Sequence, residues 1–321
     1  MNSFTITKNL ADKRLDKVLK SFFPEASLSF LYKSLRKGNI KVNKKKKKPD
    51  YKTQENDTIV CFFSDVPQAK KVTKIALHTK DSFFIKNFYP LFEDDDLLVL
   101  NKIAKIAVHP GSKHNAGKTM LDIARAHTAQ YNIKDFDTTL VHRLDLETSG
   151  ILIFAKNASI LRKMNDLIQS RHVRKYYTAL CYGVIEKDSG SITTSLERTE
   201  SKERGTKIRV SEEKSAKKAV THYHVLKRFR DASLIKLKID TGRMHQIRVH
   251  MKSIEHPILG DNQYGDFAMN KQLQKAPLSL KRMFLHASEY QFTHPITNKL
   301  IKLKAPLPPG LTQVVDIYKK L

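Results

Sequence analysis

The sequence predicts an α+β fold, chiefly because of the kinds and order of its periodic segments. Short apolar segments indicate strands, for example at residues 97–100, 151–154 and 234–239. Apolar residues at helical spacing are fewer, and the predicted helices do not alternate regularly with the strands. Regular alternation would have indicated a doubly wound parallel sheet. The length of 321 residues suits two domains, or one domain with a large appendage.

Residues 1–65 are expected to form a small α/β domain. Apolar residues at spacings of three and four predict one helix from Leu15 to Phe22 and a second from Leu28 to Leu35, with Gly38 as its stop. Alternation at Ile40 and Val42 predicts a short strand, and residues 58–63 predict another after a polar turn. Residues 66–87 are polar and lysine-bearing without a clear period, so they are expected to be a linker.

Residues 88–321 are expected to form the larger domain. Beyond the strands named above, residues 176–184 and 221–226 also have the composition of strands. Residues 160–170 carry apolar side chains on one helical face. No internal repeat is visible. Strands dominate this part of the chain.

The charge balance indicates a polyanionic partner. The chain has 59 Lys and Arg against 32 Asp and Glu, a formal net charge of +27. Residues 1–65 carry +8 and the remainder +19, so both parts share the excess. Nucleic acid is the leading candidate, because each phosphate that Lys or Arg neutralises releases counterions. A membrane surface is disfavoured, because no long apolar run and no basic amphipathic terminus is present.

Cysteine usage and the first residues bear on the compartment. Cys61 and Cys181 are far apart and outside any CxxC pattern, which argues against a disulfide framework and a zinc site. The first ten residues have no charged region followed by an apolar one, so no secretory signal is recognisable. The cytoplasm is therefore the expected compartment.

The densest chemical signal is the run HRLDLETSG at residues 142–150. It places Asp145 on a turn that leads directly into an apolar strand, within a very basic chain. In isolation, such an aspartate commonly closes an Asx turn by accepting hydrogen bonds from Thr148 or Ser149. A carboxylate on a loop that is anchored by a rigid strand can also take part in a chemical reaction.

The whole run resembles the signature HRLDxxTSG of the RluA-type pseudouridine synthases at all seven fixed positions. Residues 175–180 are similar to the family's KxYxAL segment, and residues 240–250 to its TGRxHQIRxH segment. Further matches at residues 256–261 and 285–287 keep the resemblance collinear over about residues 88–310. The resemblance implies a mixed, mainly antiparallel sheet with an active-site cleft. It also implies isomerisation of uridine to pseudouridine in RNA, without cofactor or metal.

Individual roles follow from the resemblance. Asp145 would be the catalytic carboxylate and Arg243 its ion-pair partner. Tyr177 would stack on the target uracil and assist loss of the C5 proton. Because the target base must leave its helix, Arg143 would fill the vacated position in the stack.

The residues around these positions suggest structural roles. Tyr176 points to the opposite face of its strand from Tyr177 and is expected in the core. Helical spacing from Ile247 onward assigns Arg248 to the surface. The chain's histidines, including His245 and His250, have no cysteine or carboxylate cluster near them in sequence, so no metal site is expected.

The first 65 residues resemble the S4 RNA-binding module, in the segments Arg14-Leu15-Asp16 and 37–43. The resemblance implies backbone contacts to RNA from Arg14, Lys33, Arg36, Lys37, Lys44, Lys45, Lys46, Lys47 and Lys48. The alternative for the five consecutive lysines is a solvated loop that binds nothing in particular.

Together the two parts are similar to the branch of the family that acts on large-subunit ribosomal RNA, and a monomer is expected. Three alternatives stay open. The first is the same reaction on tRNA, and the second a non-catalytic S4-type RNA-binding or ribosome-assembly protein. The third is a glycosidase, for which Glu147 is the nearest second carboxylate.

Two local departures matter. The family usually has Lys-Pro-x-Gly after the first strand of this domain, whereas Lys102 is followed by Ile103, Ala104 and Lys105. The loop conformation there is in doubt, but the chemistry is not. Residues 111–119 are similar to a phosphate-binding loop, yet five residues instead of four separate the glycines, so nucleotide binding is not expected.

Overall fold

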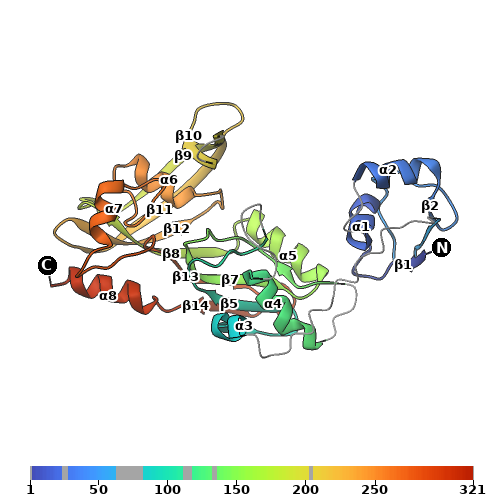
Figure 1. Ribbon diagram of the computed structural model, residues 1–321, viewed down its shortest axis with the longest axis horizontal. Coiled ribbons are helices and arrows are strands. Elements are labelled where there is room, and N and C mark those ends of the chain that lie inside the picture. Colours follow the sequence, from blue (N-terminus) through green and yellow to red (C-terminus); the bar gives the residue numbers. More distant parts are fainter. Residues whose placement is uncertain are drawn as a thin grey trace.

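The computed structural model describes residues 2–23, 28–62, 82–110, 118–131, 136–201 and 205–320. The N-terminal elements are a three-stranded antiparallel sheet in the order β1-β3-β2 and two helices (Figure 1). They are β1 (Asn2–Thr5), α1 (Leu15–Phe22), α2 (Leu28–Lys37), β2 (Ile40–Val42) and β3 (Thr58–Cys61). Both predicted helices and both predicted strands are confirmed. The four residues of β1 are too few to show a period.

This N-terminal unit has an apolar cluster of its own. The inward residues of α1 meet those of α2 and of the short sheet, and Gly38 ends α2 with a φ of 81°. The buried members that the helical and strand periods predicted are Leu15, Val18, Leu19, Leu31, Leu35, Ile40 and Val42. The periodicity was sufficient here because each short element buries a single face.

From residue 90 onward the described strands form one eleven-stranded sheet. Its main path runs β10-β9-β11-β12-β8-β13-β7-β5-β4, with β14 on β13 and β6 on β7. Among the described strands of this sheet, only β13 and β7 pair in parallel. The strands are β4 (Pro90–Glu93), β5 (Leu97–Lys102), β6 (Thr139–Leu140), β7 (Ser149–Ala155), β8 (Arg174–Tyr182), β9 (Ser189–Ser201), β10 (Gly205–Val210), β11 (Lys217–Arg228), β12 (Ala232–Ile239), β13 (Leu285–Thr293) and β14 (Leu300–Lys304). The predicted α+β class with a mixed, mainly antiparallel sheet is confirmed.

Six α-helices and a 3-10 turn are described around this sheet (Figure 1). They are α3 (Ser82–Asn87), α4 (Met120–Thr128), η1 (Ala129–Tyr131), α5 (Ala158–Gln169), α6 (Gln246–Ser253), α7 (Phe267–Leu273) and α8 (Pro309–Tyr318). The predicted helix near residues 160–170 is α5, and Asn157 caps it by accepting from the Ile160 N–H. None of the described helices is long and apolar enough to cross a membrane.

Two segments that were predicted to be loops lie partly outside the described residues, and the end of the first is helical. The expected linker at 66–87 lies outside the described residues up to 81, but Ser82–Asn87 forms α3. Phe83 and Phe84 pack against the large core, so this end of the segment is part of the folded domain. The glycine-bearing segment 111–117 also lies outside the described residues. Thr119 directly after it caps α4 through a capping box with Asp122.

Strand β7 fixes the motif HRLDLETSG to the centre of the sheet. All seven of its residues are buried. Gly150 has a φ of 112°, and a Cβ there would lie 2.2 Å from the Ala287 carbonyl oxygen of β13. Only glycine allows this approach. The loop before β7 is therefore anchored by backbone pairing on a strand more than 130 residues downstream.

The β9–β10 hairpin is an element that the sequence did not indicate. Its residues are mostly polar, and it pairs in antiparallel register from Gly205–Ser201 to Val210–Leu196. Leu196 and Ile208 are buried against Val249 of α6 and against Tyr264. The hairpin thereby holds the start of α6, which borders the cleft described next, and Tyr264, whose ring lies against the guanidinium of Arg248.

Candidate active site

One large cleft brings together three segments that are distant in sequence: residues 142–148, strand β8 and residues 239–248. Its volume is about 1070 Å³, which is ample for an extruded nucleotide. The four residues predicted to act on the base or its surroundings all line it: Arg143, Asp145, Tyr177 and Arg243.

The carboxylate of Asp145 is available to the cleft. The turn that carries it closes through the backbone, with the Thr148 N–H donating to the Asp145 carbonyl oxygen at 3.1 Å. The side chain is not used as an Asx cap. It is 27% exposed and accepts a hydrogen bond from Arg248 Nη1 at 3.0 Å. A fixed, partly exposed carboxylate results.

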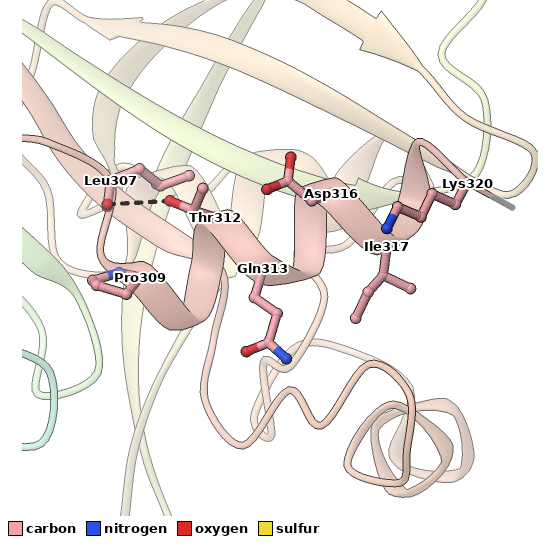
Figure 2. Close-up of a pocket in the computed structure, with 7 residues that line it drawn as sticks. All are labelled: Leu307, Pro309, Thr312, Gln313, Asp316, Ile317 and Lys320. Atoms are coloured by element: carbon pink, nitrogen blue, oxygen red, sulfur yellow. Dashed lines mark hydrogen bonds between the residues drawn. The ribbon is translucent and has the colours of Figure 1, made fainter.

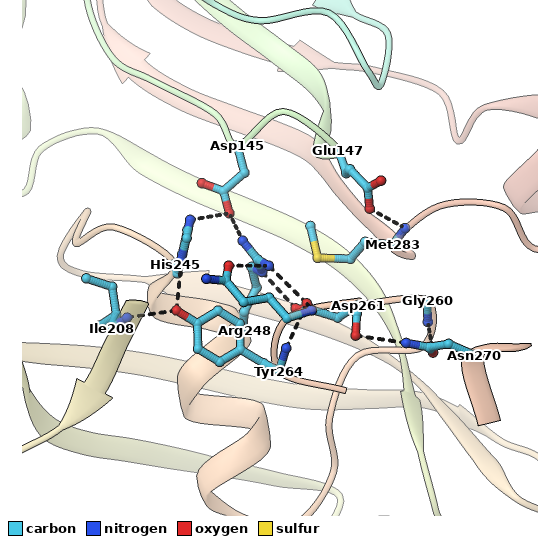
Figure 3. Close-up of polar contacts among 11 residues, drawn as sticks. Asp145, Glu147, Ile208, His245, Arg248, Gly260, Asp261, Tyr264, Asn270 and Met283 are labelled. Atoms are coloured by element: carbon cyan, nitrogen blue, oxygen red, sulfur yellow. Dashed lines mark hydrogen bonds and ion pairs between the residues drawn. The ribbon is translucent and has the colours of Figure 1, made fainter. Parts of the chain in front are cut away.

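The partner of Asp145 is Arg248, and the prediction of Arg243 was wrong (Figure 3). Arg243 is exposed, and its Nε donates to the Lys218 carbonyl oxygen at 3.4 Å. The surface assignment of Arg248 was wrong as well, because its side chain is only 11% exposed. Helix α6 begins at Gln246, so Arg248 lies in its first turn, and the face turned away from the core borders the cleft instead of solvent.

Asp261 holds the guanidinium of Arg248 from the other side. Its two carboxylate oxygens accept from Arg248 Nε at 2.7 Å and Nη2 at 2.9 Å (Figure 3). Burial by itself would lower the pKa of Arg248, but the bonds and charge of Asp261, followed by those of Asp145, raise it overall. The cation is therefore permanent, and the fork of two bonds fixes its plane. Asp261 lies in the segment 256–261 that resembles the family, but no role was predicted for it from the sequence.

His245 is a second neighbour of Asp145 that sequence reasoning treated as structural. Its Nε2 lies 4.0 Å from Asp145 Oδ2, and its Nδ1 lies 2.9 Å from the hydroxyl of Tyr264. That hydroxyl already accepts the Ile208 N–H, so its own proton is available to His245 Nδ1. The proton of a neutral imidazole then sits on Nε2, toward Asp145. Burial lowers the pKa of His245 in spite of Asp145, which favours this neutral form.

Lys102 supports the Asp145 turn from below. It ends β5 fully buried, and its Nζ donates to the carbonyl oxygens of Ile103, Leu146 and Thr148 at 2.8–3.0 Å. Burial lowers its pKa to about 7. Lys105, at the family's glycine position, has a φ of 69°, and its N–H donates to the Leu146 carbonyl oxygen. The loop thus keeps a left-handed residue without a glycine.

Tyr177 is buried at the floor of the cleft. Its hydroxyl lies 2.9 Å from that of Tyr290, and burial raises its pKa to about 12. A phenol this weakly acidic stays protonated at neutral pH, which disfavours it as a base for the C5 proton. Tyr176 points to the other face as expected, but the core assignment was wrong. It is half-buried, with the Lys236 ammonium 4.7 Å from its ring centre.

The basic residues expected to bind RNA are mostly exposed. Arg143 is exposed at the cleft, and Lys33, Arg36 and Lys37 are exposed on α2. Arg14 is exposed too, but its guanidinium forks onto Asp16 at 2.8 and 3.2 Å. In the lysine run four side chains are exposed, while Lys47 is half-buried with its ammonium 4.3 Å from the Tyr51 ring centre.

Two further features of the described residues were weighed as sites. Asp94, Asp96 and His294 come together, but His294 Nδ1 accepts the N–H groups of Ile296 and Thr297. The imidazole proton is therefore on Nε2, 3.2 Å from Asp94 Oδ2, and no lone pair is left for a metal.

A hollow also runs along α8 (Figure 2), lined by Leu307, Pro309, Thr312, Gln313, Asp316, Ile317 and Lys320. Its carboxylate Asp316 is paired with Lys319 at 2.7 Å. The hollow brings no second titratable group into contact with that pair, so it resembles no reaction centre.

The chain is similar to known proteins over most of its length. Residues 96–253 match the family described as RNA pseudouridylate synthase. The chain is 35% identical to ribosomal large subunit pseudouridine synthase C of Pasteurella multocida, over 98% of this chain and 93% of that protein. It is 34% identical to the protein of the same name from Escherichia coli K12, over 97% and 94%.

Solved structures share the fold. Human RNA pseudouridylate synthase domain containing 4 superposes with a TM-score of 0.58 at 24% identity, covering 72% of this chain and 93% of that one. Human RNA pseudouridylate synthase domain containing 1 gives 0.57 at 24% identity, covering 74% and 96%. With its near-complete match to curated relatives, the chain belongs to the RNA pseudouridylate synthase family.

Proposed function

We propose that this protein converts uridine to pseudouridine in large-subunit ribosomal RNA, with Asp145 as the catalytic carboxylate. The observation that carries the proposal is the Asp145–Arg248 ion pair at 3.0 Å in a cleft of about 1070 Å³. The names of the relatives from Pasteurella multocida and Escherichia coli support the choice of RNA.

The reaction places few demands on the site, and these residues meet them. The bond from uracil N1 to ribose C1′ breaks, and its electron pair leaves with the base. The Asp145 carboxylate attacks C1′ or assists this departure. After the base turns, C5 bonds to C1′, and where Asp145 had attacked C1′ that bond breaks and its electron pair returns to the carboxylate; C5 then loses its proton, and N1 gains one. No oxidant is consumed, so atoms and electrons balance.

The neighbours of Asp145 would keep it ready. Arg248 holds the carboxylate oxygen in position, while Asp261 keeps Arg248 from rotating away. Tyr177 would contact the flipped uracil with its ring, since its hydroxyl is engaged by Tyr290. Arg143, exposed beside Asp145, would occupy the position the base vacates.

We further propose that residues 1–65 form an S4-like domain that grips the RNA backbone outside the cleft, and that the protein works in the cytoplasm. The exposed cations of α2 lie next to the lysine run, because Lys46 packs against Gly38 at the end of α2. Exposed cations without fixed partners suit phosphate contacts, which give affinity without sequence choice.

The decisive experiment compares the wild type with Asp145→Asn. Ribosomal RNA carrying C5-tritiated uridine should release tritium with the wild type and none with the variant, while RNA affinity stays within a few fold. Glu147→Gln is the matched control: its carboxylate accepts the Met283 N–H, and it should retain activity. Tritium release from tRNA alone would identify tRNA as the substrate. A wild type that releases no tritium from either RNA would indicate a non-catalytic RNA-binding protein.

A further inference from the structure

Lys175 stands apart from every other buried charged residue that the structure describes. It is 7% exposed, at the start of β8, and lines the cleft with Asp145 and Tyr177. Among the described residues, none makes a hydrogen bond or an ion pair with its ammonium. The other buried lysines are satisfied, Lys102 by three carbonyl oxygens and Lys156 by Glu93.

Lys175 is largely buried but reaches the cleft, and such an ammonium without a protein partner is costly, because burial removes most of its water without returning hydrogen bonds. Consistent with that cost, burial lowers the pKa of Lys175. The two carboxylates of the cleft do not relieve it: Asp145 is held by Arg248, and Glu147 accepts the Met283 N–H. A group maintained at such a cost next to a reaction centre points to a partner that arrives with the substrate.

The depth of Lys175 indicates which part of the nucleotide it meets. Residues 175 and 177 are two apart in β8, so their side chains share the cleft face, and Tyr177 is 6% exposed. A flipped base enters such a pocket edge first, and its edge atoms are read by hydrogen bonds. Arg143 and Arg243 are exposed at the cleft, where cations would meet the phosphates of the strand instead of the base.

We propose that Lys175 is a further catalytic residue that donates a hydrogen bond to a carbonyl oxygen of the target uracil. When the N1–C1′ bond breaks, the electron pair goes to N1, and its charge spreads onto the ring carbonyl oxygens. The ammonium stabilises that charge without transferring its proton. Such a bond is stronger in the transition state than in the ground state, so it accelerates the reaction. The proposal rests on the function proposed above.

The first test is a split between kcat and KM. Lys175→Met should lower kcat on the order of 10²-fold, while KM for the RNA changes only a few fold. The matched control is Lys236→Met on the neighbouring strand β12. Lys236 pairs in register with Thr178, on the opposite face, and its ammonium bonds Glu289 at 2.8 Å. Raised KM with unchanged kcat in Lys175→Met would mean a phosphate contact and overturn the proposal.

A stability measurement separates catalysis from structure. Because Lys175→Met removes a buried cation without a partner, the variant should unfold at a higher urea concentration than the wild type. Loss of stability parallel to the loss of activity would assign Lys175 a structural role instead.

A modified RNA substrate tests whether Lys175 stabilises the negative charge on the departing base. In RNA with 5-fluorouridine at the target position, fluorine already stabilises the departing base. In single turnover, Lys175→Met should then slow the disappearance of the N1-linked nucleotide less in this RNA than in RNA with uridine at the target position. An equal slowing on both RNAs would show that the lysine does not stabilise the base. All arms require a wild type that releases tritium from uridine RNA, so failure of the function is seen first.

Discussion

The cleft and the N-terminal unit use the same kinds of charged side chain in opposite ways. In the cleft, Asp145, Arg248 and Asp261 are partly or fully buried and joined by hydrogen bonds of 2.7–3.0 Å. On the N-terminal unit, the cations of α2 and most of the lysine run are exposed. Chemistry needs a charge fixed in one geometry, whereas gripping a polyanion needs charges free to meet phosphates. Mutations should therefore affect rate and folding in the first region and salt-dependent affinity in the second.

The largest effect is expected from breaking the buried network. Arg248→Met should lower kcat on the order of 10²-fold and the free energy of unfolding by about 3 kcal/mol, because Asp261 is left buried and unpaired. Arg243→Met, on an exposed side chain, should change the free energy of unfolding by less than about 0.5 kcal/mol. Activity assays and urea denaturation compare the two. Equal effects would restore Arg243 as the partner of Asp145.

Replacing Lys102 gives the next effect, and the size of its effect on the free energy of unfolding depends on pH. Folding lowers its pKa from 10.5 to about 7, so between these values the unfolded chain binds more protons and stability rises with pH. Lys102→Met removes this contribution. The wild type should therefore gain stability over the variant from pH 7 toward pH 10, by at most about 1.4 kcal/mol per pH unit.

Urea denaturation of both proteins at pH 7, 8, 9 and 10 measures that gain. A constant difference between them would mean that the three carbonyl oxygens keep Lys102 protonated throughout. At pH 7 the variant should also lose activity, because the turn carrying Asp145 loses its three side-chain bonds.

The exposed region should respond only in affinity. Replacing the five lysines at 44–48 with glutamine should weaken RNA binding and flatten its dependence on salt, by up to about 0.9 in log–log slope for each lysine that meets a phosphate. The rate at saturating RNA should not change. Binding titrations from 50 to 300 mM salt test this. Unchanged affinity at every salt concentration would identify the run as a solvated loop.

The smallest effect is expected where the family pattern is broken. Lys105 holds a φ of 69°, which costs a residue with a side chain on the order of 1 kcal/mol. Lys105→Gly should therefore raise the free energy of unfolding by up to about 1 kcal/mol and leave kcat unchanged. Lys118→Gly, at the start of the capped turn before α4, is a control without positive φ. A destabilised Lys105→Gly would mean that the charge or the stem of this lysine matters more than its backbone.

Elements with a strong apolar pattern were predictable from the sequence. The strand at β7 is a continuous apolar run that is buried throughout, the helix at α5 carries apolar residues at helical spacing, and the motif around Asp145 identified the cleft loop. The β9–β10 hairpin was missed, because its polar residues give weak alternation and it is stabilised by α6 and Tyr264. Local pattern does not contain such tertiary packing.

The site residues that were missed have a common cause. Periodicity assigned Arg248 to the helix face away from the core, and it does not distinguish solvent from a cleft. Lys102 follows an apolar strand and looked like an ordinary strand end. Only its pairing with Gly150 of β7 places it under the Asp145 turn. Both roles come from contacts between distant segments.

The parallel pairing of β7 with β13 has a consequence for biosynthesis. The backbone that carries Asp145 is completed by partners at His286 and Ala287, and Glu147 is held by the Met283 N–H. While the chain is still emerging from a ribosome, these partners do not yet exist. A nascent or prematurely ended polypeptide therefore contains the entire HRLDLETSG run without a working centre. Competence to modify RNA would therefore be acquired late in translation, when β13 pairs with β7.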